Sequence, residues 1–309
     1  MSKFKVWAAQ VRANFLILAV LLVAIGLAFA YKYKMPGEDF NVAHALLLLI
    51  GIVSAHISVN LFNEYSDYRS KIDFHTKPTP FSGGSGMLIK GYTKPGPVLG
   101  AAIGTILLSF GIGLYFTFVS HWLVLLYSVI GGLTILLYTD FLAKILMGEL
   151  FAGLALGTLV VLGTFVAMNA SPGDKLGNII PLEVIIISIP PGILTSLLLF
   201  INEFPDMEAD KKGGRYHLVI KLGKKVSSYV YTAGLFVTFT IIIAAPLLGF
   251  GSFWLWIALL PLPMAINASI TALKFYHDTP KLIPALGSNV ITVLATDLLL
   301  AMAVVIEIV

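Results

Sequence analysis

Long uncharged apolar runs constrain this chain more than any other feature of its sequence. A helix needs about 20 apolar residues to cross a bilayer, and nine stretches approach or reach that length. The composition agrees, because only 12% of the 309 residues are charged and the mean hydropathy is +0.93. So few charges cannot cover a water-facing surface. The nine stretches are residues 14–31, 44–62, 97–119, 121–138, 148–168, 182–201, 228–249, 253–275 and 288–308.

These runs predict an all-α polytopic membrane bundle of about nine transmembrane helices, formed by one domain over residues 1–309. Helices are expected because they satisfy their own backbone hydrogen bonds inside the bilayer. Only Ser120 and His121 separate the third and fourth runs, which predicts a tight hairpin there. The first run lacks a small-residue cleavage pattern, so we interpret it as a membrane helix. The chain has no cysteine, which excludes disulfides and zinc-thiolate sites.

The distribution of basic residues predicts the orientation. If the N-terminus is cytoplasmic, only Lys32, Lys34 and Lys175 of the 20 Lys and Arg residues lie outside. The positive-inside rule therefore favours a cytoplasmic N-terminus, an external C-terminus and a place in the plasma membrane. The two longest polar loops, residues 63–96 and 202–227, then lie on the cytoplasmic side, where we expect the active site.

The two loops begin alike. The first starts with Asn63-Glu64 and continues to Asp67, and the second starts with Asn202-Glu203 and continues to Asp206. They follow the second and the sixth predicted helix. This spacing indicates two related four-helix halves plus a ninth helix.

The second loop carries a regular stripe of oxygen-bearing side chains. Asn202, Asp206 and Asp210 are spaced i, i+4, i+8, which places them on one face of a helix. Such a stripe suits a hard cation such as Mg²⁺. Pro205 lacks a backbone donor, so we expect the helix to kink or restart near it.

The first loop is less regular. Asn63 and Asp67 share a helix face, but Asp73 can join them only if the helix ends or unwinds in between. The glycine-rich segment 81–86 follows, and its exposed amides could cradle phosphate oxygens. Solvated acids paired with nearby Lys and Arg are the alternative. Two matching acidic clusters on one membrane face would, however, repel each other without a cation, and the interleaved basic residues indicate a bound anion as well.

Both motifs resemble those of the UbiA superfamily of intramembrane prenyltransferases. Glu64 stands where many members have Asp, and the spacing from Asn63 to Asp73 fits the MenA-like branch, which prenylates naphthoates. The resemblance implies Mg²⁺-dependent transfer of a polyprenyl group from polyprenyl diphosphate to an aromatic quinone precursor in the lipid bilayer. The implied acceptor is 1,4-dihydroxy-2-naphthoate, in menaquinone biosynthesis. Nothing in the sequence points to nucleic acid as a partner.

The resemblance also implies residue roles. The implied metal ligands are Asn63, Asp67, Asp73, Asn202, Asp206 and Asp210. The four Asp residues among them are expected to be catalytic, together with Lys144. The expected diphosphate-binding residues are Arg12, Asn63, Arg69, Tyr138, Asn202 and Lys211. Several of these basic residues, and Lys212 and Arg215, have an alternative role as positive-inside anchors.

Few polar residues lie within the predicted membrane helices. His56 and Asn60 share a face with Asn63, and Asp297 lies in the middle of the last run. Because His56 and Asn60 share the face of the first motif, we consider them as acceptor-pocket residues. We consider Asp297 as a third, because an intramembrane carboxylate is costly to keep without a function. Polar packing is the alternative role, with Asn267 one candidate partner for Asp297.

Other functions remain open from the sequence. A UbiA-type enzyme can use another acceptor, such as 4-hydroxybenzoate or a glyceryl phosphate lipid. A secondary transporter also has repeated halves and broken helices, but its site would lie near the bilayer midplane. Here the acidic residues gather at one membrane face instead. The sequence sets neither the prenyl chain length nor the oligomeric state.

Overall fold

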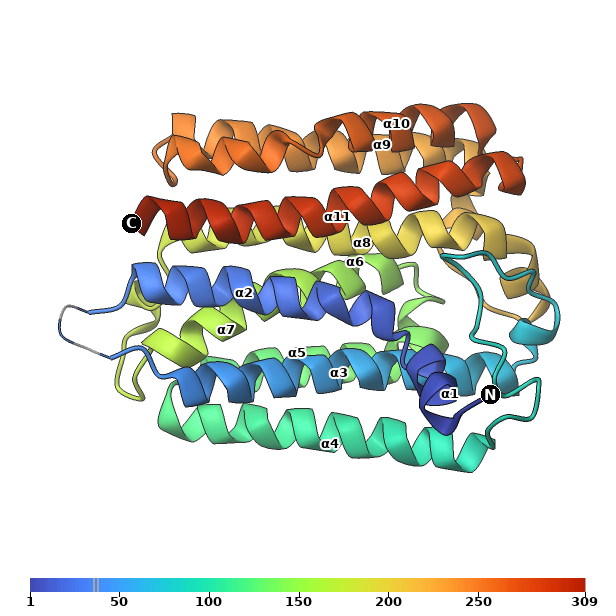
Figure 1. Ribbon diagram of the computed structural model, residues 1–309, viewed down its shortest axis with the longest axis horizontal. Coiled ribbons are helices and arrows are strands. Elements are labelled where there is room, and N and C mark those ends of the chain that lie inside the picture. Colours follow the sequence, from blue (N-terminus) through green and yellow to red (C-terminus); the bar gives the residue numbers. More distant parts are fainter. Residues whose placement is uncertain (36, 38, 309) are drawn as a thin grey trace.

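The computed structural model describes residues 1–35, 37 and 39–308, which form helices and turns without strands. The long helices run side by side along one axis (Figure 1). The α-helices are α1 (Lys3–Gln10), α2 (Leu16–Lys32), α3 (Val42–Arg69), α4 (Pro95–Val119), α5 (Leu123–Leu137), α6 (Gly148–Gly153), α7 (Leu159–Asn169), α8 (Leu182–Lys212), α9 (Leu218–Leu247), α10 (Leu262–Phe275) and α11 (Thr279–Ile308). The short 3₁₀ and π elements are η1 (Ala13–Phe15), η2 (Ile72–Phe74), η3 (Tyr138–Leu142), η4 (Leu154–Thr158), η5 (Leu176–Asn178) and η6 (Phe253–Leu259).

The predicted all-α membrane bundle is confirmed, although the count of nine spans is not. Within the described residues, seven helices are long and apolar enough to cross a membrane. An eighth span results if η6 and α10, bent by 42°, count as one. The remaining apolar helix, α5, has only 15 residues. The expected hairpin is present, because α4 ends at Val119 and α5 begins at Leu123.

The predicted loop over residues 202–227 is wrong for most of its length. Helix α8 continues to Lys212 and α9 begins at Leu218, so the connection is confined to residues 213–217. Nor does the chain restart at Pro205, which lies inside α8. Counting apolar residues finds where a helix leaves the hydrocarbon, whereas backbone hydrogen bonding continues into the polar part of the helix. Helix α9 is interrupted at Gly223, which has a φ of 75°.

Helices α3 and α8 end at the same end of the bundle, where the chain after α3 also crosses (Figure 1). Small residues let α8 pack closely against the α6–η4 segment. A Cβ built on Gly153 would lie 2.5 Å from the carbonyl oxygen of Gly192, and one on Gly157 would lie 2.7 Å from the Gly192 Cα. Close backbone approach through small residues is a common way to fix one membrane helix against another.

An ion cluster joins three helices at the opposite end. Lys32 Nζ lies 2.7 Å from a carboxylate oxygen of Glu183 and 2.7 Å from one of Glu307. The Tyr33 hydroxyl donates a 2.5 Å hydrogen bond to Glu183. These contacts tie the end of α2 to the start of α8 and the end of α11. The N-terminus lies near the other end of the bundle (Figure 1).

Candidate active site

The two Asp motifs converge on one cavity of about 90 Å³ at the end of the bundle. All six predicted metal ligands line it, and so do two further residues that were predicted to bind diphosphate. The cavity thus brings together Asn63, Asp67, Asp73, Asn202, Asp206 and Asp210 with Arg12 and Tyr138. Their roles stay predictions, but their convergence is a property of the fold.

The first motif reaches the cavity through a broken helix. Helix α3 ends at Arg69, Lys71 takes a left-handed conformation with a φ of 62°, and η2 carries Asp73 back toward Asp67. This is the interruption that the six-residue spacing requires. Burial, and then the negative charges of Asp67 and Glu64, raise the pKa of Asp73 to about 7.

The second motif reaches the cavity on a continuous helix. Asn202, Asp206 and Asp210 lie on successive turns of α8, as their spacing predicts. Oδ1 of Asn202 and Oδ1 of Asp206 are buried and have no hydrogen-bond partner among the described residues. Oδ2 of Asp73 is in the same state. Buried oxygens without partners are expensive, which is the condition a bound cation would relieve.

Arg215 joins the two motifs. It lies in the short connection between α8 and α9, and one of its amino groups forms an ion pair with Asp67. The other donates a 3.3 Å hydrogen bond to Asp210. One guanidinium therefore bridges a carboxylate of each motif and partly balances their charge.

The glycine segment closes the cavity from the side. The amide of Gly83 donates a 3.0 Å hydrogen bond to Asp206, and Arg12 donates a 3.2 Å hydrogen bond to the carbonyl of Gly83. A Cβ on Gly84 would overlap the carboxylate of Asp73. Glycine at position 84 is therefore what allows the backbone to approach the acid so closely.

Glu64 holds this segment in place. Its side chain is buried and accepts a 3.1 Å hydrogen bond from the amide of Ser85 and a second one from the Ser85 hydroxyl. Glu64 does not line the cavity. The residue that departs from the common UbiA motif thus supports the glycine segment from outside the site.

Three predicted basic site residues do not reach the cavity. Lys144, Arg69 and Lys211 are exposed and are absent from its lining. Arg69 is two positions after Asp67, which turns it to the other side of α3, where it lies 5.8 Å from the ring centre of Tyr65. Lys211 directly follows Asp210 and is rotated away by about 100°. Arg69 and Lys211 were predicted to be in the site because they are close to Asp67 and Asp210 in sequence, but the helix turns them away from it.

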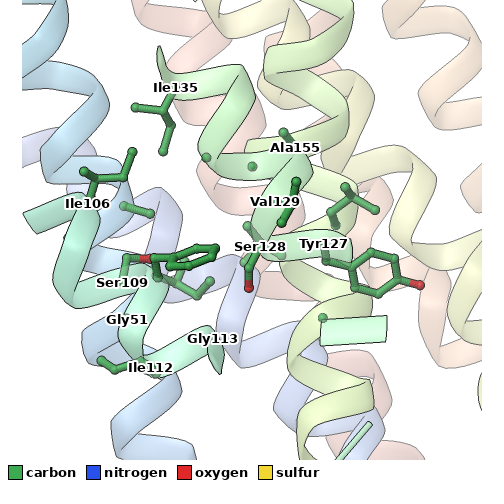
Figure 2. A pocket seen from close by; sticks show the side chains of 18 of the residues that line it. Gly51, Ile106, Ser109, Ile112, Gly113, Tyr127, Ser128, Val129, Ile135 and Ala155 are labelled. Carbon is green, nitrogen blue, oxygen red and sulfur yellow. The ribbon is translucent and has the colours of Figure 1, made fainter. Parts of the chain in front are cut away.

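Two further cavities continue from the first toward the middle of the bundle. One, of about 140 Å³, shares Arg12, Asn63, Tyr138 and Asn202 with the Asp cavity, and His56 and Asn60 also line it. The other, of about 320 Å³, is apolar and lies among α3, α4, α5 and residues 148–169. Figure 2 shows part of its lining, including Gly51, Ile106, Ile112 and Tyr127. His56 lines both, so it stands at their junction.

Asp297 lines none of these three cavities, so the structure does not support its prediction as an acceptor-pocket residue. It is fully buried in α11, and neither carboxylate oxygen has a hydrogen-bond partner within the described part of the chain. Asn267, one of the candidate partners, donates a 2.8 Å hydrogen bond to Ser288 instead. The sequence showed that Asp297 is buried in the membrane domain, but not what surrounds it.

Sequence spacing alone does not single out Glu64 or Arg215. The available signal for Glu64 is the Asn-Glu pair that begins both motifs. Arg215 follows Lys211 and Lys212 in the same basic stretch, and nothing in the spacing separates it from them. Only the turn after α8 directs Arg215 inward.

Two bacterial proteins that share one name are similar to this chain in sequence. The chain is 26% identical over 313 residues to the 1,4-dihydroxy-2-naphthoate octaprenyltransferase of Escherichia coli, covering 98% of this chain and 96% of that protein. It is 30% identical over 226 residues to the Bacillus subtilis protein of the same name, covering 72% of this chain and 69% of that one.

A solved structure supports the fold. A UbiA homologue from Archaeoglobus fulgidus, bound to GPP and Mg²⁺, superposes with a TM-score of 0.64 at 17% sequence identity, over 97% of this chain and 99% of that one. In sequence, the model of the UbiA prenyltransferase family matches residues 19–283. With this match over most of its length, the chain belongs to the UbiA prenyltransferase family.

Proposed function

We propose that this prenyltransferase moves a polyprenyl group from polyprenyl diphosphate to 1,4-dihydroxy-2-naphthoate, with Mg²⁺ held by the two Asp motifs. The observation that carries the proposal is the convergence of four Asp residues from α3, η2 and α8 on one cavity that opens into apolar space. The names of the bacterial relatives support the acceptor. The GPP and Mg²⁺ bound by the Archaeoglobus homologue support the donor and the metal.

The residues of the Asp cavity fit Mg²⁺. This cation prefers carboxylate and amide oxygens, and the cavity offers them from both motifs. Three such oxygens, on Asp73, Asn202 and Asp206, are buried without a partner among the residues that the structure describes. Bound Mg²⁺ would neutralise the diphosphate and stabilise the charge that grows on it as the allylic C–O bond breaks.

Other groups of the chain are placed to receive the diphosphate. Arg12 and Tyr138 line both the Asp cavity and the cavity next to it, so they stand where the diphosphate meets the reacting carbon. Their donors would bind the leaving group, and they would act most strongly once its charge has developed. Backbone groups of Gly83 and Gly84 also line the site.

The apolar cavities suit the rest of the donor and the acceptor. An allylic cation is captured by water, so it needs a dry environment until the aromatic ring attacks it. The 320 Å³ cavity provides apolar walls for the isoprenoid chain. The middle cavity, lined by His56 and Asn60, lies between that chain and the Asp site, and we place the aromatic acceptor there.

The test is a transfer assay with the purified chain in liposomes. Farnesyl diphosphate, Mg²⁺ and 1,4-dihydroxy-2-naphthoate should yield a prenylated naphthoquinone precursor and free diphosphate, detected by mass spectrometry. Parallel assays contain 4-hydroxybenzoate or a glyceryl phosphate lipid as acceptor. Prenylation of one of these but not of the naphthoate would contradict the proposed acceptor. Full activity in excess EDTA would contradict the proposed role of Mg²⁺.

We also propose that the protein lies in the plasma membrane with the Asp site facing the cytoplasm, since nearly all basic residues gather at that end. The chain has no cysteine, so single cysteines report on topology without background. In intact cells, an impermeant maleimide should label Lys175→Cys and spare Lys90→Cys. The reverse pattern would contradict the orientation.

A further inference from the structure

A second group of side chains of the types that bind metals lies next to the Asp cavity. Glu149 comes from α6, Glu203 from α8 and His217 from the residue before α9. All three are buried, with exposed fractions of 5%, 7% and 1%. One potential ligand atom of each lies within 4.8 Å of the other two. Glu203 also lines the Asp cavity, but Glu149 and His217 do not.

The atoms that face one another in this group lack hydrogen bonds. Oε2 of Glu149, Oε2 of Glu203 and Nδ1 of His217 are buried and have no hydrogen-bond partner in the part of the chain that the structure describes. Nδ1 of His217 lies 3.2 Å from Oε2 of Glu203, as an ion pair when the imidazole is protonated. An imidazolium at His217 compensates the charge of Glu203, and a metal ion bound by the neutral imidazole would compensate both glutamates.

Other atoms of Glu149 and His217 form hydrogen bonds with neighbouring residues. Oε1 of Glu149 accepts a 2.8 Å hydrogen bond from the amide of Leu218. Nε2 of His217 lies 3.3 Å from Oδ2 of Asp210. In the neutral tautomer with its hydrogen on Nε2, that N–H donates to Asp210, and the lone pair of Nδ1 is on the side of Glu203. A carboxylate behind the far nitrogen of a histidine is the usual support of a metal-bound imidazole.

We infer that Glu149, Glu203 and His217 bind a divalent transition metal ion, of which Zn²⁺ is the test case, at a site separate from the Mg²⁺ site. An imidazole nitrogen beside carboxylates favours a transition metal over Mg²⁺. Bonds of 2.0–2.2 Å in a tetrahedral site place the ligand atoms about 3.4 Å apart. Glu203 and His217 already have nearly this spacing, at 3.2 Å, and a shift of at most about 1.4 Å would bring in Glu149. The ion would join α6, α8 and α9 and would fix Asp210 through His217.

The test measures bound metal in the full chain after the Asp site has been disabled. The double variant Asp67→Asn/Asp206→Asn is treated with chelator, dialysed against micromolar Zn²⁺ in excess Mg²⁺, and analysed by elemental mass spectrometry. We expect about one zinc ion per chain. Adding His217→Gln or Glu149→Gln should reduce zinc to background, whereas His75→Gln, at an exposed histidine, should not.

Co²⁺ provides a second readout that does not depend on activity. Cobalt bound in place of zinc should give a visible ligand-field spectrum in the double Asn variant, and His217→Gln should abolish or shift it. If the double variant elutes as a folded protein but binds neither Zn²⁺ nor Co²⁺, the group is a buried ion pair only, and the inference is overturned. Zinc that is retained after His217→Gln overturns it as well.

Discussion

The two Asp motifs present similar side chains to one cavity from different backbones. On α8, Asp206 and Asp210 lie on one continuous helix, and their positions follow from helical periodicity. On the other side, α3 ends at Arg69 and a left-handed residue turns the chain so that η2 can present Asp73. The second motif is therefore positioned by its own helix. The first depends on contacts outside the motif, so equivalent chemistry at the two motifs does not imply equivalent sensitivity to mutation.

Substituting one Asp of each motif should have the largest effect on the transfer rate and tests whether the two motifs contribute equally. Asp67→Asn and Asp206→Asn should each lower the rate of prenyl transfer by about a thousandfold, since each removes a charge that would hold the Mg²⁺ bound to the leaving group. The measurement is diphosphate release from farnesyl diphosphate, with thermal unfolding to show that the fold is kept. If only one variant loses activity, the cavity uses one motif rather than two.

A smaller effect tests the dependence of the first motif on its surroundings. Gly84→Ala places a Cβ against the carboxylate of Asp73 and should lower the rate by about a hundredfold, because a displacement near 1 Å misaligns the site. The control is Gly100→Ala in α4, where a Cβ meets no atom within 4 Å. Equal rates for the two variants would show that Asp73 does not need its observed position.

The pH dependence of Mg²⁺ binding tests the contribution of Asp73 to the first motif. The pKa of Asp73 is raised to about 7, so this carboxyl is protonated, and is a poor ligand, below that pH. The Mg²⁺ concentration for half-maximal activity should rise by about tenfold per pH unit below pH 7 and level off above it. In Asp73→Asn this tenfold contribution should be lost and the slope should become shallower. An unchanged slope in the variant would assign the proton to another group.

The smallest effect is expected at Glu64, which accepts hydrogen bonds from Ser85 in the glycine segment. Glu64→Gln keeps the shape of the side chain but weakens its two hydrogen bonds to Ser85. A loss of about 1 kcal/mol corresponds to a fivefold rise in KM for the prenyl diphosphate, with little change in kcat. A thousandfold fall in kcat would instead place Glu64 among the residues that act on the substrate.

The long helices and one face of the site could be predicted from the sequence, because the apolar runs are long and the acidic residues follow helical spacing. Apolar windows found the apolar part of each long helix, and the i, i+4, i+8 spacing placed Asn202, Asp206 and Asp210 on one face. The six-residue gap before Asp73 correctly required a break in α3. These inferences rest on local geometry, which a helix imposes whatever its neighbours are.

The remainder depends on tertiary contacts that spacing does not encode. Lys144, Arg69 and Lys211 carry the expected charge but point to solvent, whereas Arg215, in the same basic stretch as Lys211, turns inward. The membership of Glu149 in the group with Glu203 and His217 follows only from the packing of α6 against α8. A long side chain near a motif is directed by the backbone turn that carries it.

The ion cluster at the far end of the bundle has a mechanical consequence. It anchors α8 at Glu183, and the helix then runs about 35 Å, at 1.5 Å per residue, to Asp206. Such a rod acts as a lever arm: a tilt of one degree about its anchored end displaces Asp206 by about 0.6 Å. The close approach of Gly153 to Gly192, near the middle of α8, leaves little room for such a tilt and so limits how far Asp206 can move.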